Sequence, residues 1–67
     1  MKKFITVQRI TFDLYFDESG SLVSIESDYC EESMLQFIKK NFPYGIITLP
    51  EIENNINRLI HEYNKSK

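Results

Sequence analysis

The residues of this chain that could do chemistry are mostly carboxylates, and they gather in one stretch. Between Ile10 and Ile38 there are seven acidic residues and no Lys or Arg, and all eight basic residues lie outside. Segregated charge of one sign favours a surface of the opposite sign, so the stretch predicts a docking surface for a basic partner protein. The competing interpretation is an ordinary solvated surface. The seven acids are Asp13, Asp17, Glu18, Glu26, Asp28, Glu31 and Glu32.

Other chemistry is hard to assemble from these side chains. Nucleophilic catalysis needs a nucleophile, a base and an orienting group, but the chain has one Cys, Cys30, and one His, His61. The run Asp17–Gly20 places its glycine too early for a calcium loop, and a single Cys with a single His cannot form a zinc site. We therefore expect no enzyme activity, catalytic residue, metal or cofactor.

Composition sets the class of protein. Sixty-seven residues, 42% of them apolar and 27% charged, with a net charge of −2, predict one small globular domain over residues 1–67. No apolar run approaches the length of a membrane span, and a lone cysteine fits a reducing compartment, so we expect a cytoplasmic protein. An isoelectric point near 5.2 argues against direct binding of nucleic acid.

The N-terminal half is predicted to form a β-hairpin. Phe4–Phe16 reads as a half-buried strand, with its apolar residues at even positions from Ile10 onwards. The run Asp17–Gly20 has the residues of a turn, and a second strand follows over Leu22–Ser27, with Val23 and Ile25 on one side.

The register of this hairpin can also be predicted. The apolar residues are even-numbered in one strand and odd-numbered in the other, so the loop should hold an even number of residues. A two-residue loop would set Asp13 opposite Glu26, which brings like charges together. A four-residue loop, with Leu14 opposite Val23, avoids this and is preferred.

Two helices are predicted to follow. Asp28 and Glu31 have the spacing of a capping box at the start of the first helix, which ends before Pro43. Thr48 and Glu51 form a second capping box, and the helix that follows ends in a frayed tail over residues 65–67. The short apolar segment around Ile46 is left open between a loop and a third strand.

These elements predict an α+β fold of order ββαα, in which an antiparallel hairpin packs against two helices. One side of the hairpin and the apolar stripes of both helices should form the core. The predicted core residues are Phe12, Leu14, Phe16, Val23, Ile25, Met34, Phe37, Ile38, Ile52, Ile56, Leu59 and Ile60.

The sequence is compatible with three functions. The first is a small protein-binding inhibitor, antagonist or adaptor, of the immunity-protein, antitoxin or phage-inhibitor kind, whose acidic hairpin docks on a basic partner. The second is a structural or oligomerisation module, such as a homodimer, that associates through an apolar surface. The third is a nucleic-acid-binding regulator. The apolar surface of the second hypothesis comprises Ile5, Val7, Phe42, Tyr44 and Ile46.

Overall fold

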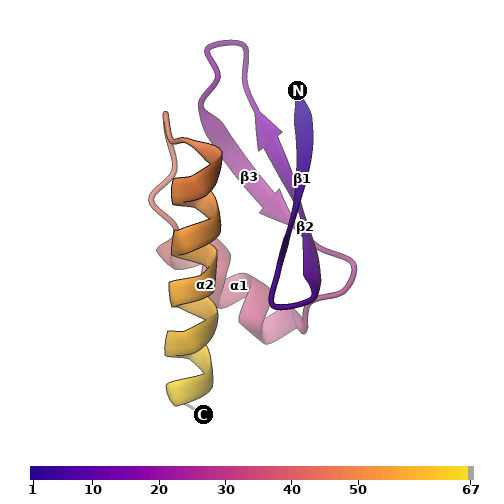
Figure 1. Cartoon of the computed structure of the whole chain (residues 1–67), viewed down its shortest axis with the longest axis vertical. Coiled ribbons are helices and arrows are strands. Elements are labelled where there is room, and N and C mark those ends of the chain that lie inside the picture. The colour runs from indigo at the N-terminus through magenta and orange to yellow at the C-terminus, as the bar shows by residue number, and fades with distance from the viewer. Residues whose placement is uncertain (67) are drawn as a thin grey trace.

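The computed structural model describes residues 1–66 and has three antiparallel strands followed by two helices (Figure 1). The predicted α+β fold is confirmed. Its sheet has the strand order β1-β2-β3, and Lys67, at the end of the predicted frayed tail, lies outside the described residues. The elements are β1 (Lys2–Val7), β2 (Ile10–Phe16), β3 (Leu22–Glu26), α1 (Glu32–Asn41) and α2 (Leu49–Lys65).

The long first strand predicted over Phe4–Phe16 is wrong, because the chain reverses at Gln8 and Arg9. Both residues have positive φ, 50° and 68°, which is the backbone of a two-residue type I′ hairpin turn. The reversal pairs Ile5 with Phe12 and places Ile5 on the same face as the even-numbered apolar residues of β2. The third strand therefore comes from the N-terminus and not from the segment around Ile46.

The preferred register of the second hairpin is also wrong. Leu14 lies opposite Ile25, and Asp13 lies opposite Glu26, which is the like-charged pairing that a four-residue loop would avoid. A bulge between Tyr15 and Phe16 shifts the next pair to Phe16 and Leu22, so Val23 becomes the extra residue. Leu22 is consequently buried and Val23 is 54% exposed, because burial of apolar area outweighs repulsion between two partly solvated carboxylates.

The capping box predicted at Asp28 is absent, whereas the second one is present. Helix α1 has Glu31 as its N-cap and no side-chain hydrogen bond there. Helix α2 has Thr48 as its N-cap. The backbone N–H of Glu51 donates to the hydroxyl oxygen of Thr48, and the backbone N–H of Thr48 donates to the carboxylate of Glu51. Near Ile46 there is one isolated bridge in the part of the chain that the structure describes, between Gly45 and Leu22, and no strand.

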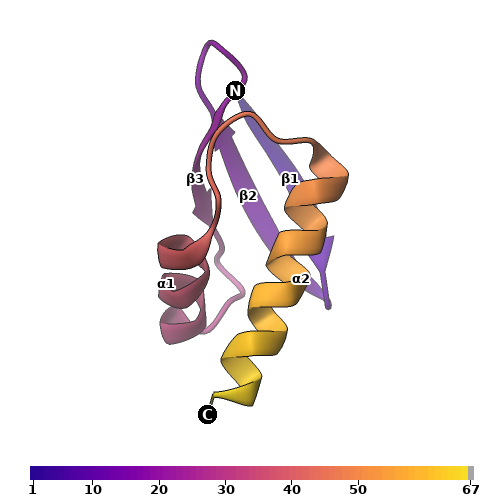
Figure 2. The same cartoon turned by 90° about the vertical axis from the view of Figure 1, so that its left-hand side faces the viewer.

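Both helices cover the same face of the sheet, with α2 packed on β1 and α1 packed on β3 (Figure 2). The core lies between these layers. Of the predicted core residues, Val23 is exposed, and Phe16 and Phe37 are only partly buried at the margin of the core. Four buried residues were not predicted: Val7, Leu22, Leu35 and Phe42. The buried core residues are Val7, Phe12, Leu14, Leu22, Ile25, Met34, Leu35, Ile38, Phe42, Ile52, Ile56, Leu59 and Ile60.

Candidate protein-binding surface

In the described residues, 1–66, the second face of the sheet carries no helix, and we call it the open face (Figures 1 and 2). Side chains alternate between the faces of a strand, so the pairing of the strands fixes which residues lie there. One row crosses all three strands from Phe4 through Asp13 to Glu26. The open face comprises Lys2, Phe4, Thr6, Thr11, Asp13, Tyr15, Ser24 and Glu26.

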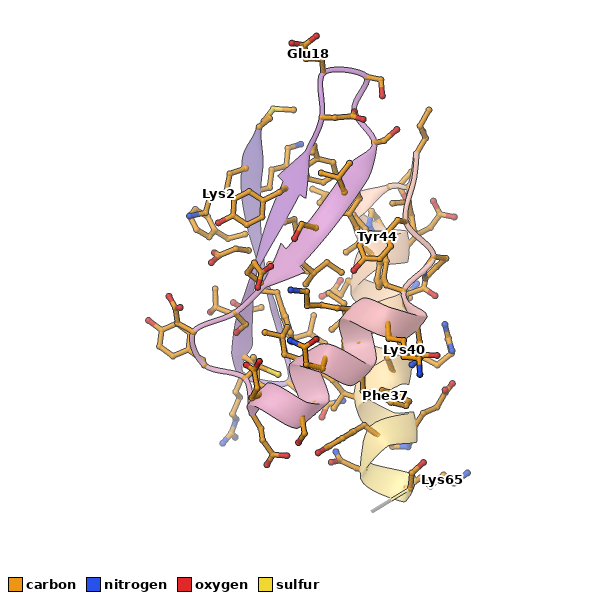
Figure 3. The ribbon with its side chains drawn as sticks, turned by 180° about the vertical axis from the view of Figure 1, so that it is seen from behind. Lys2, Glu18, Phe37, Lys40, Tyr44 and Lys65 are labelled. Carbon is orange, nitrogen blue, oxygen red and sulfur yellow. The ribbon has the colours of Figure 1, made fainter. Side chains whose placement is uncertain are left out.

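The seven acids predicted as one surface occupy three places along a molecule 37 Å long. Asp13 and Glu26 lie side by side on the open face. Asp17 and Glu18 lie in the turn between β2 and β3, with Glu18 at its outer end (Figure 3). The remaining three, Asp28, Glu31 and Glu32, lie between β3 and the first turn of α1.

Two of these acids stabilise the local fold. The Asp17 carboxylate accepts hydrogen bonds from the Ser19 hydroxyl at 2.7 Å, the Ser21 backbone N–H at 3.0 Å and the Ser19 backbone N–H at 2.9 Å. The Ser19 hydroxyl and then the Ser21 N–H lower the pKa of Asp17. Glu26 accepts a hydrogen bond from Lys39 of α1 at 2.8 Å, which lowers the pKa of Glu26 and raises that of Lys39.

Two further acids bind neighbouring side chains. The Glu31 carboxylate accepts hydrogen bonds from the hydroxyls of Ser33 and Tyr63, each at 2.7 Å, and so joins the start of α1 to the last turns of α2. Glu32 accepts a hydrogen bond from the Gln36 side chain at 3.1 Å, one turn further along α1. Part of the hydrogen-bonding capacity of these two carboxylates is therefore used within the chain.

Three acids remain, and we call them the free acids: Asp13, Glu18 and Asp28. Within residues 1–66 their side chains form no hydrogen bond and no ion pair. Glu18 and Asp28 are exposed, and Asp13 is half-buried beside Phe4. Their charge is therefore available to a second molecule, whereas the charge of Glu26 is already balanced by Lys39.

An aromatic group on the open face was not predicted from the sequence. The Lys2 ammonium lies 5.2 Å from the centre of the Phe4 ring and 5.7 Å from that of Tyr15, in cation–π contact with both. Phe4 is 65% exposed even so. The signal that would have revealed this group is the Gln8-Arg9 turn, because only the reversal places Phe4 next to Asp13.

The apolar surface of the second hypothesis is divided between the core and the surface. Val7 and Phe42 are each only 5% exposed and belong to the core, which removes them from any surface of the monomer. Ile5 is half-buried, whereas Tyr44 is 40% and Ile46 85% exposed. The predicted residues therefore do not form one continuous patch.

The lone cysteine is poorly suited to nucleophilic attack. Cys30 is half-buried, and burial, followed by the charges of Glu31 and Glu32, raises the pKa of its thiol. His61 is exposed on α2. Across residues 1–66 there is no cluster of His, Cys, Asp and Glu arranged for a metal ion, no pocket, and no helix with the length and apolarity to cross a bilayer.

Comparison with known proteins gives no relative of this chain. No family model matches it, and neither a curated protein nor a solved structure matches it.

Proposed function

We propose that this chain is a protein-binding inhibitor or adaptor that acts by occupancy, with its open face and free acids placed against a basic surface of a partner protein. The observation that carries the proposal is the pair formed by Phe4 of β1 and Asp13 of β2, which face each other across the two strands on the open face. An exposed aromatic ring lies there directly beside a carboxylate that has no hydrogen-bond or ion-pair partner among residues 1–66. Protein interfaces combine such aromatic anchors with charges that select the partner.

Charge supports the same proposal. Glu18 at the hairpin tip and Asp28 in the loop before α1 extend the negative charge beyond both ends of the open face. An extended field of this kind accelerates encounter with a Lys- and Arg-rich surface and weakens as salt is added. The free thiol of Cys30 fits a reducing compartment, and we propose the cytoplasm as the place of action.

The experiment is a differential capture from a lysate of the native cell. The test variant carries Asp13→Asn, Glu18→Gln and Asp28→Asn. The control carries Glu53→Gln, Asn54→Lys and Asn64→Lys, which add the same charge at exposed positions of α2 that make no side-chain hydrogen bond within residues 1–66. Wild type and both variants are immobilised, and captured proteins are quantified by mass spectrometry at about 0.05 M and about 0.5 M salt.

We expect a basic protein that wild type and the α2 control capture equally at low salt. The free-acid variant should lose most of it, and high salt should release it from all three. Equal capture by all three chains would contradict the proposal. An equal loss in both variants would also contradict it, since net charge alone would then explain the binding.

A further inference from the structure

The outer edge of β1 carries backbone groups that nothing in residues 1–66 pairs with. Met1 and Phe16 exchange two hydrogen bonds, at 2.8 Å and 3.0 Å, so this pair is a hydrogen-bonded one. In an antiparallel ladder such pairs alternate, and the N–H and C=O of Lys2, Phe4 and Thr6 must therefore point away from β2. Helix α2 packs on β1, and within residues 1–66 no backbone hydrogen bond joins a helix to this edge.

The opposite edge of the sheet, formed by β3, is partly covered. Gly45 exchanges two backbone hydrogen bonds with Leu22, at 2.7 Å and 3.2 Å, and so covers part of the edge of β3. Edge strands with free backbone groups are templates for a further strand. The edge of β1 is accordingly the place where this sheet can grow.

The residues of β1 fit a second copy of the same strand. In an antiparallel pair centred on Phe4, Phe4 faces Phe4 of the second copy, and Lys2 faces Thr6 in both directions. All the outward N–H and C=O groups of these three residues then find partners. Lys3 faces Ile5, so no two charges of like sign are directly opposed.

Neighbouring registers fit less well. A shift that centres the pair on Lys3 sets two lysines directly opposite each other, which is unfavourable. A shift that centres it on Ile5 sets Lys2 against Gln8, whose φ of 50° takes it out of the strand and whose side chain donates to Asn57 at 2.7 Å. The Phe4-centred register alone pairs every outward group.

We propose that the chain forms a two-fold symmetric dimer in which the β1 strands of two copies pair antiparallel about Phe4. The two sheets join into one, and the two open faces become continuous. The two Phe4 rings, each 65% exposed in the monomer, lie across the axis from each other, which favours a cross-strand aromatic contact. The inference does not depend on the basic partner proposed above.

The first test removes an edge hydrogen bond and keeps the backbone ladder between β1 and β2, at the cost of the hydrogen bond between the Thr6 and Thr11 hydroxyls at 3.2 Å. Thr6→Pro deletes an outward N–H, and proline is tolerated at such a position of an edge strand. We expect the dissociation constant from sedimentation equilibrium to rise by at least about tenfold, because two symmetry-related hydrogen bonds are lost. The matched control is Ile46→Ser, which removes the most exposed apolar side chain elsewhere and should leave dimerisation unchanged.

A second measurement identifies the register. Amide hydrogen exchange of Lys2, Phe4 and Thr6 in the wild-type chain should slow as protein concentration rises, while exchange of the remaining β1 amides stays constant. Phe4→Lys and Phe4→Glu should each weaken self-association, and a mixture of the two should associate severalfold more tightly than either alone. Circular dichroism checks that each variant is folded.

Three results would overturn the dimer. The first is a wild-type chain that stays monomeric at millimolar concentration, which would leave the edge to an extended segment of another protein. The second is a dimer that Thr6→Pro leaves intact. The third is an Ile46→Ser variant that dissociates as readily as Thr6→Pro, which would point to general apolar association.

Discussion

Individual side chains decide how much of the acidic stretch remains available for binding. Asp13 and Glu26 are directly opposed on adjacent strands, an arrangement that is unfavourable by itself. Lys39 reaches Glu26 from α1, and its ammonium balances one of the two charges. The tolerance of this like-charged pair therefore depends on a residue of a different element.

Removal of either member of the ion pair should have unequal effects. Lys39→Met leaves two opposed carboxylates without a cation and should lower the free energy of unfolding by about 1 kcal/mol. Glu26→Gln loses the ion pair but also relieves the repulsion with Asp13, so we expect a change within about 0.5 kcal/mol, given that the Glu26 side chain is 44% exposed. Urea denaturation at low salt measures both, and a larger loss for Glu26→Gln would contradict this account.

The sequence predicted the acids but not their partners. The segregation of carboxylates between Ile10 and Ile38 is visible in the residue order alone. The residue order does not show which carboxylates are free. Glu31 accepts a hydrogen bond from Tyr63, 32 residues away, and Glu26 accepts one from Lys39, 13 residues away. Such pairs exist only after α1 and α2 have packed, and no local spacing indicates them.

At the scale of elements, hairpin geometry explains the main errors of prediction. The capping box at Thr48 was predicted correctly because its two partners are three residues apart and depend on nothing else. The Gln8-Arg9 turn lacks the Asn and Gly that mark type I′ turns, so the long strand was not divided. The bulge that exposes Val23 depends on how β3 meets β2 and leaves no mark in the alternation.

The bulge gives a direct test of the register. Leu22→Ala removes a side chain that is 1% exposed and should destabilise the domain by about 2–5 kcal/mol, as cavities in packed cores do. Val23→Ala alters a side chain that is 54% exposed and should change the free energy of unfolding by less than about 0.5 kcal/mol. Thermal unfolding followed by circular dichroism compares the two, and the reverse order would restore the register preferred from the sequence.

At the scale of the whole molecule, stability should be greatest near neutral pH. In the folded chain, hydrogen bonds from Lys39 to Glu26, from Ser19 to Asp17 and from Thr48 to Glu51 lower the pKa of each acid, and these groups stabilise the fold above their usual pKa values of 4.5, 3.8 and 4.5. That stabilisation is lost as the pH falls through the lowered values.

At alkaline pH, the stability is lost as the pH rises. The hydrogen bond with Glu26 raises the pKa of Lys39 above 10.5, and burial raises that of Cys30 above 9.0, so both contributions are present below these values and disappear as the pH rises through the folded ones. Melting temperatures measured from pH 3 to 11 should fall at both ends. In Lys39→Met the fall below pH 4.5 should be shallower, and an unchanged acid limb would contradict the assignment to Glu26.

The order of the elements along the chain has a consequence for folding. Phe12, Leu14 and Ile25 belong to the same core cluster as Ile52 and Ile56 of the last helix, so the core is complete only after that helix has packed. A chain in which α2 has not yet packed therefore exposes the apolar face of the sheet, and such partly folded species are prone to aggregation. Any change that weakens the packing of α2 would prolong this open state and favour aggregation over complete folding.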